Sequence, residues 1–140
     1  VEKNYLNAKR DKQAGILPLV LDLTNPTPSL GWNLEERQAL DKRETPDLVM
    51  ALALIHHLAI SNNVPLSKIA FFFSGLSEYL IIEFVPKEDS QVQKLLSTRP
   101  DIFPNYTLEG FEAEFGEYYD LIEKRSIPES HRTLYLLKKK

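Results

Sequence analysis

The sequence of 140 residues predicts an α/β protein whose mixed sheet combines parallel strands with a C-terminal antiparallel hairpin. Residues 48–55 and 79–85 are near-continuous apolar runs, the pattern of strands buried on both faces of a parallel sheet. Between them, 65–77 carries apolar residues at helical spacing, which indicates a β-α-β unit. Two further runs, 118–126 and 132–138, flank a short turn and predict the hairpin.

The chain before the first of these runs predicts three elements. Residues 1–13 suit a helix that ends near Gly15. Residues 16–23 read as a buried strand, in which Pro18 favours an edge position or the strand's start. Residues 34–42 suit a helix that ends before a Thr-Pro pair.

Three predicted helices follow. The first starts at Pro65, a residue suited to the first helical position. Asp89 or Ser90 is expected to cap a helix to about residue 98, and Thr107 a helix through 115. Strands alternating with helices predict a parallel sheet, to which the hairpin is added.

Composition excludes several classes of protein. The net charge of −3 gives no bulk attraction to nucleic acid. The absence of cysteine excludes disulfides and thiolate chemistry, and no apolar run reaches the ~20 residues of a membrane span. We expect a cytoplasmic protein without membrane or nucleic-acid partners. Since Met50 is the only methionine, Val1 is not a natural start, and we expect a fragment.

His56 and His57 follow the carboxyl end of the first apolar run, the edge at which open α/β sheets bind ligands. A histidine can take a proton from a nucleophile, so both are candidate catalytic residues. The alternative is a polar strand end without chemistry. We predict no metal site, because adjacent side chains diverge and the sequence offers no third ligand at suitable spacing.

The chain resembles the C-terminal part of class I S-adenosylmethionine-dependent methyltransferases, in particular bacterial nodulation-protein-like ones. Residues 47–58, with an acid, an apolar run and His-His-Leu, resemble the family's fourth strand and the segment after it. Residues 80–87 resemble the fifth strand, 19–23 the third and 133–138 the seventh. The resemblance covers essentially the whole chain and implies a Rossmann-like sheet.

The family's sheet has the strand order 3-2-1-4-5-7-6, and its first strand carries a glycine-rich loop. None of the five glycines here forms G-x-G after a strand. The resemblance therefore implies one domain, 1–140, that lacks the glycine-rich strand and loop. Without the first two strands, the third is expected beside the fourth or paired with another copy. An exposed sheet edge would then permit a homodimer.

The resemblance also implies site residues. S-adenosylmethionine is the expected cofactor, with Asp22 and Leu23 at its adenine and with Ala53 and Leu54 at its methionine portion. Asp22 has the alternative of capping Thr24 or Asn25.

Two further residues are expected at the substrate. Trp32 either walls the pocket or packs in the protein. Glu83, inside a strand, either faces the methyl acceptor or pairs with a lysine or arginine.

The implied function is that of an S-adenosylmethionine-dependent methyltransferase acting by positioning and desolvation, on an acceptor that the sequence does not identify. We expect this portion alone to be inactive and to bind cofactor weakly. One alternative is a non-catalytic methyltransferase-like module for binding or dimerisation. Another is a flavodoxin-like or receiver-like domain, which the C-terminal hairpin disfavours.

Overall fold

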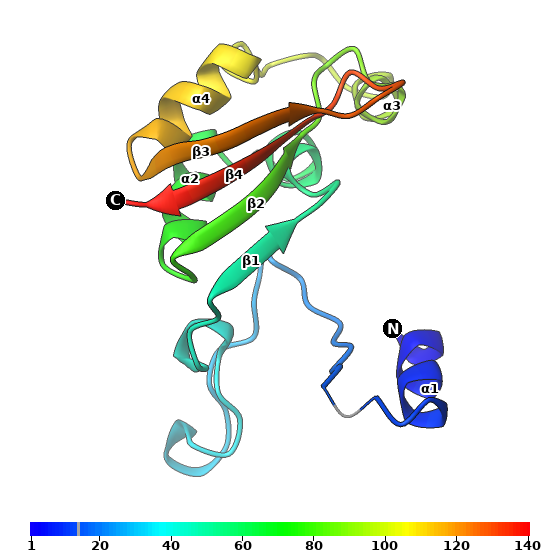
Figure 1. The fold of residues 1–140 in the computed structure, drawn as a ribbon, viewed down its shortest axis with the longest axis vertical. Coiled ribbons are helices and arrows are strands. Elements are labelled where there is room, and N and C mark those ends of the chain that lie inside the picture. Colours follow the sequence, from blue (N-terminus) through cyan, green and yellow to red (C-terminus); the bar gives the residue numbers. More distant parts are fainter. Residues whose placement is uncertain (14) are drawn as a thin grey trace. The chain divides into compact units, whose positions relative to one another are not determined.

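The computed structural model describes residues 1–13 and 15–140, which divide into two compact units, Val1–Lys42 and Arg43–Lys140. The second unit contains a four-stranded sheet in the order β1-β2-β4-β3 (Figure 1). The strands are β1 (Leu48–Ala51), β2 (Tyr79–Phe84), β3 (Tyr119–Ser126) and β4 (Thr133–Lys139). β1 and β2 are parallel, whereas β4 is antiparallel to both β2 and β3. The predicted mixed α/β fold is confirmed, and it is consistent with a partial Rossmann-like fold.

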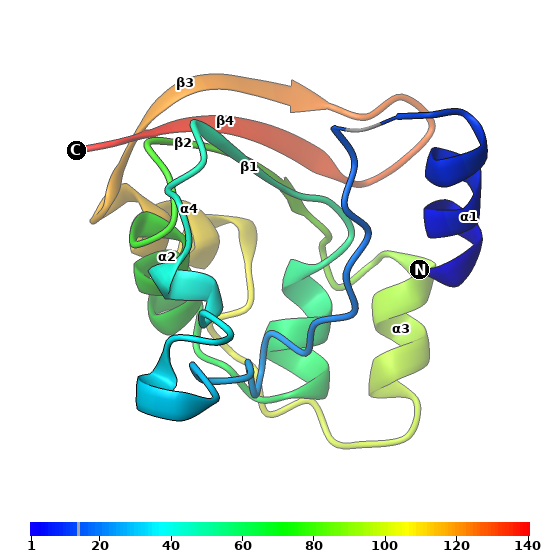
Figure 2. The same cartoon turned by 90° about the horizontal axis from the view of Figure 1, so that it is seen from below.

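The helices of the second unit cover one face of this sheet (Figure 2). They are a π-helix (His57–Ser61), α2 (Leu66–Ser74), α3 (Ser90–Leu96) and α4 (Leu108–Gly116). Two predicted caps are confirmed, because Asp89 accepts from Gln91 N at 2.8 Å and Thr107 accepts from Gly110 N at 3.0 Å. Residues 59–64, between the first apolar run and the helix that starts at Pro65, contain most of the π-helix.

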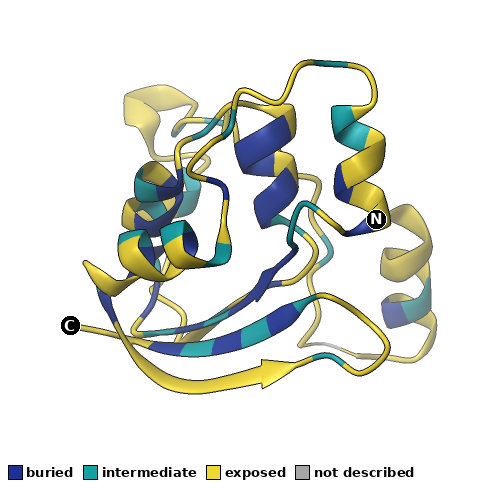
Figure 3. Ribbon diagram, turned by 90° about the horizontal axis from the view of Figure 1, so that it is seen from above, coloured by how far each residue is buried: buried dark blue, intermediate teal, exposed yellow. Residues whose placement is uncertain are grey.

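The core lies between the sheet and these helices. Phe111 of α4 is at its centre, with ring centroids 5.1 Å from Phe84 and 4.8 Å from Tyr135. Along β4 buried and half-buried residues alternate, whereas β3 is almost entirely exposed (Figure 3). The alternation arises because successive side chains of a strand point to opposite faces.

The first unit differs from its prediction. A helix is present at the start of the chain, α1 (Glu2–Arg10), in agreement with the sequence. The strand predicted at 16–23 is wrong: these residues pair with no strand among those described, and Val20 is 82% exposed. Apolar composition favours a strand only where a neighbouring strand accepts its hydrogen bonds, and Pro18 has no N–H to donate. The alternative that placed this segment beside the fourth strand is wrong as well, because within the described chain β1 pairs only with β2.

The helix predicted at 34–42 is also wrong. The chain instead forms two short 3₁₀ turns, Trp32–Leu34 and Leu40–Lys42, with Leu30 and Arg37 paired in an antiparallel bridge between them. Asn33 and Leu34 have φ angles of 55° and 59°, which an α-helix does not allow. Among all described residues, no helix is long and apolar enough to cross a bilayer.

Candidate functional site

A buried carboxylate lies at the carboxyl end of the parallel pair. Glu83, near the end of β2, is 6% exposed, and its Oε2 accepts a hydrogen bond from the backbone N–H of Ala53 at 2.6 Å. Ala53 belongs to the loop after β1 and has a φ angle of 50°, a left-handed conformation that costs a non-glycine residue energy. The hydrogen bond from Ala53 therefore fixes a strained loop next to the end of β1.

Arg132 balances the charge of this carboxylate. Its Nη1 donates to Glu83 Oε1 at 3.1 Å, while Nε and Nη2 donate to the two carboxylate oxygens of Asp89 at 2.7 and 3.2 Å. The bidentate contact with Asp89 has the fork geometry that arginine and carboxylate favour. The hydrogen bonds from Arg132 hold the pKa of Asp89 below its usual range and raise that of Arg132. We call Glu83, Asp89 and Arg132 the carboxylate–arginine cluster.

This cluster joins three parts of the fold. Glu83 belongs to β2, Asp89 caps α3, and Arg132 precedes β4 in the hairpin turn. All three line a shallow hollow of about 500 Å³. The remaining lining residues are Glu88, Ser90, Ile127, Glu129, Ser130 and His131. Of the two alternatives for Glu83, pairing with an arginine is therefore observed, and the residue also lines a hollow at this end of the sheet.

The two adjacent histidines have different surroundings. His56 is 1% exposed, and its Nδ1 has no hydrogen-bond partner among the described residues. Burial, followed by the neighbouring His57 and Arg132, lowers the pKa of His56 to about 4, so its imidazole is neutral at pH 7. His57 is exposed, and its ring centroid lies 4.1 Å from that of His56. Of the pair, only His57 is accessible to a nucleophile in solution.

The predicted cofactor residues fall in different units. Asp22 and Leu23 belong to the first unit, where Asp22 Oδ1 accepts from Thr24 N at 2.9 Å and from Thr24 Oγ1 at 2.7 Å. Both hydrogen bonds lower the pKa of Asp22, and the bond from the Thr24 hydroxyl has the larger effect. The capping alternative for Asp22 is thus observed. Trp32, in the same unit, is 87% exposed and does not pack in a core. In the second unit, Ala53 is exposed and Leu54 is half-buried at the end of β1.

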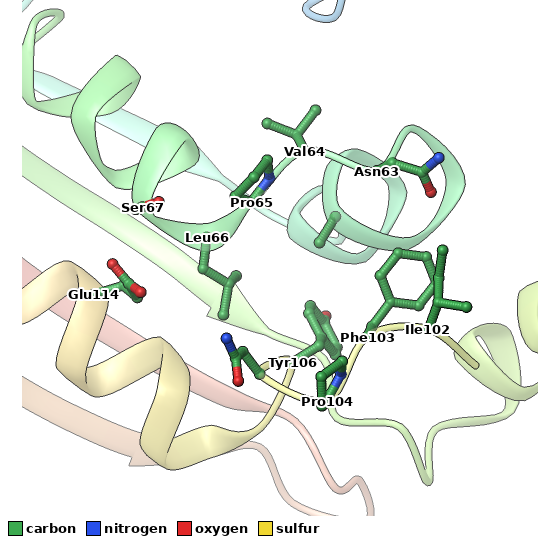
Figure 4. A pocket seen from close by; sticks show the side chains of 12 residues that line it. Asn63, Val64, Pro65, Leu66, Ser67, Ile102, Phe103, Pro104, Tyr106 and Glu114 are labelled. Carbon is green, nitrogen blue, oxygen red and sulfur yellow. The ribbon is translucent and has the colours of Figure 1, made fainter.

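A separate cavity of about 370 Å³ lies beside the start of α2 (Figure 4). The side chains of Val64 and Pro65 form one side of it, and those of Phe103 and Pro104 form the other. Arg99 ties the two sides together by donating to Ile60 O at 2.6 Å and to Asn63 Oδ1 at 2.7 Å. None of the residues predicted for the site lines this cavity.

Sequence reasoning missed Arg132 and the contribution of Asp89 to the site. The available signal was Glu83 itself, because a carboxylate inside a buried strand requires a cation. It could not identify which of the 17 lysines and arginines supplies the charge, because Arg132 is 49 residues away in sequence. Within the described residues, no group of three or more potential ligands is placed to hold a metal ion.

Taken together, the fold and the site define an α/β protein with a charged cluster at the carboxyl end of its parallel strands. The chain is similar to nodulation protein NoeA of Rhizobium meliloti (strain 1021), with 46% identity over 119 residues. The match covers 85% of this chain but only 25% of NoeA, so the chain spans about a quarter of that relative. The expected relationship to a nodulation-protein-like sequence is confirmed. No protein-family model and no solved structure matches the chain.

Removal of the Arg132 guanidinium should destabilise the protein. Arg132→Met leaves Glu83 and Asp89 buried without their cation, and we expect the free energy of unfolding to fall by about 3 kcal/mol. Urea denaturation followed by circular dichroism measures the change. Arg125→Met is the matched control, because Arg125 pairs with Glu123 at the surface and is 76% exposed. Equal stability of the two variants would contradict a buried cluster.

The His56 imidazole should titrate far below a free histidine. In the unfolded chain this histidine has its ordinary pKa of about 6.5, so protonation favours the unfolded state. The contribution of the neutral, buried imidazole to stability is therefore complete above about pH 6.5. That contribution is lost as the pH falls through the folded pKa of about 4. NMR titration of the imidazole resonances measures the pKa directly. A His56 midpoint between pH 6 and 7 would show that this side chain is solvated.

Proposed function

We propose that this chain is the acceptor-side, C-terminal portion of an S-adenosylmethionine-dependent methyltransferase. The order and direction of its strands carry the proposal. The expected family sheet ends in strands 4-5-7-6, and the observed order β1-β2-β4-β3 has the same pattern, with the last strand of the chain inserted antiparallel between two others. Flavodoxin-like and receiver-like sheets, which end on a parallel strand and a helix, do not contain such an insertion.

The end of β1 offers exposed apolar surface for the methionine portion of the cofactor. Leu52, which is 50% exposed, and Ala53 present apolar surface at the carboxyl edge, where open α/β sheets bind ligands. When bound, S-adenosylmethionine would supply a methyl group on a sulfonium, and in-line attack of the acceptor nucleophile on the methyl carbon would break the carbon–sulfur bond and release S-adenosylhomocysteine. Glu83 holds the loop through the Ala53 N–H, so its contribution is to position the surface that the cofactor contacts.

Proton transfer, where the acceptor needs it, falls to His57 rather than His56. His57 is exposed beside this loop, whereas His56 is buried and has a pKa of about 4, which makes it a weak base. The hollow next to Glu83 and Arg132 is the proposed location of the acceptor. NoeA is named a nodulation protein, and we extend that association to this chain as part of the proposal.

The alternative is a non-catalytic methyltransferase-like module for binding or dimerisation. One feature favours it: the carboxylate of Asp22, which the resemblance places at the adenine of the cofactor, is engaged by Thr24 within its own loop. Weak cofactor binding that is confined to the end of β1 would support the methyltransferase portion over the non-catalytic module.

Titration with S-adenosylhomocysteine, followed by amide chemical shifts, tests the proposal. We expect saturable binding with a dissociation constant of about 1 mM, because the glycine-rich part of the site is missing. The shifts should concentrate in residues 52–57. Ala53→Arg should abolish them, whereas Leu121→Arg, on exposed β3, should leave them unchanged. Shifts that avoid residues 52–57, or no binding at about 10 mM, would favour the non-catalytic module.

A further inference from the structure

The cavity beside the start of α2 has room for a small molecule. Its volume of about 370 Å³ falls within the range of roughly 300–1,000 Å³ that is typical of small-molecule sites. At the ~30 Å³ that one water-sized group occupies, it holds roughly a dozen non-hydrogen atoms. Apolar side chains form both walls, residues 64–66 from the start of α2 and residues 102–104 from the loop before α4.

The loop that forms the second wall is held in place by three anchors. Lys87 Nζ donates to Phe103 O at 2.8 Å, and the Tyr106 hydroxyl donates to Val85 O at 2.7 Å. Arg99 ties the loop to the opposite wall through the hydrogen bonds described above. The cavity is therefore preformed, and a ligand that enters it spends little binding energy on ordering its walls.

The two ends of the cavity differ in charge. Among the described residues that line it, Glu114 is the only charged one, and it lies with Ser67 at the end opposite Phe103 (Figure 4). Arg99 lies outside the other end, where its guanidinium carbon is 5.1 Å from the centroid of the Phe103 ring. A ligand in the cavity thus meets a negative charge at one end and a positive charge behind the other.

The polar groups at the acidic end are available to a ligand. In the part of the chain that the structure describes, Glu114 has no ion-pair partner and Ser67 Oγ makes no hydrogen bond, whereas Glu112 of the same helix pairs with Lys124. A carboxylate only accepts hydrogen bonds, and a hydroxyl oxygen accepts them as well, whereas an ammonium group has three donors. This end of the cavity therefore suits an ammonium group and repels an anion.

We propose that this cavity binds a small organic ammonium ion with an apolar body, such as an arylalkylamine. The ammonium group donates to Glu114 and Ser67, and the apolar body lies between the two walls and points toward Phe103. Arg99 disfavours the reverse orientation, because that orientation brings two positive charges together. The inference goes beyond the proposed methyl transfer and does not depend on cofactor binding at the end of β1.

Titration of the full chain with phenethylammonium chloride, followed by amide chemical shifts, tests the proposal. We expect saturable shifts concentrated in residues 63–67 and 102–106, with a dissociation constant of about 1 mM. 2-Phenylethanol has a neutral hydroxyl in place of the ammonium group and should bind about fivefold more weakly, the factor expected for a partly exposed ion pair. Phenylacetate, which carries a negative charge, should not saturate the site.

Two variants of α4 separate the charge of the cavity from the charge of the helix as a whole. Glu114→Gln keeps the size of the side chain but removes its charge, so it should bind phenethylammonium and 2-phenylethanol equally. Glu117→Gln removes the same charge from the C-terminal end of α4, outside the cavity, and should keep the fivefold preference.

Equal binding of phenethylammonium and 2-phenylethanol by the wild-type chain would overturn the proposal. A preference for the ammonium that survives in Glu114→Gln would do the same, because another group would then supply the charge. Shifts outside the two walls, or no saturable binding at about 10 mM phenethylammonium, would also contradict it. Shifts induced by S-adenosylhomocysteine in residues 52–57 are a separate observation, so either proposal can fail without the other.

Discussion

The buried charge of Glu83 is the constraint on which the described site depends. A carboxylate that is 6% exposed must be compensated, and here the compensation comes from two directions, the Ala53 N–H and the Arg132 guanidinium. One partner belongs to the loop after β1 and the other to the turn before β4, which are 79 residues apart in sequence. A single side chain thus fixes the relative positions of the segments at the carboxyl end of the sheet.

The strand order brings Arg132 within reach of Glu83. Because β4 enters antiparallel beside β2, the hairpin turn before β4 lies at the carboxyl end of β2. Arg132 reaches Glu83 and Asp89 only from that turn. The loop after β1, which is considered for the cofactor, lies at the same end of the sheet as this turn, because β1 is parallel to β2.

The sequence predicted those elements whose signal is local or periodic. The run at 79–85 is β2, and the spacing of apolar residues at 65–77 gives α2. The run at 48–55 was harder to divide: β1 ends at Ala51, because Ala53 takes a left-handed conformation and a helical segment begins soon after. Residues 16–23 have strand composition without a partner strand, which composition alone does not reveal. The sequence could predict that Glu83 pairs with a lysine or arginine, but it could not identify Arg132, because Arg132 is distant in sequence.

Hydrogen exchange at the Ala53 amide tests the central claim most directly. If Glu83 holds the loop, the Ala53 N–H is protected in the wild-type chain although the residue itself is exposed. Glu83→Gln keeps the shape of the side chain but removes the charge that strengthens this hydrogen bond, and it should speed exchange at Ala53 more than about tenfold. An Ala53 amide that exchanges at the rate of an unstructured peptide in the wild-type chain would contradict the account.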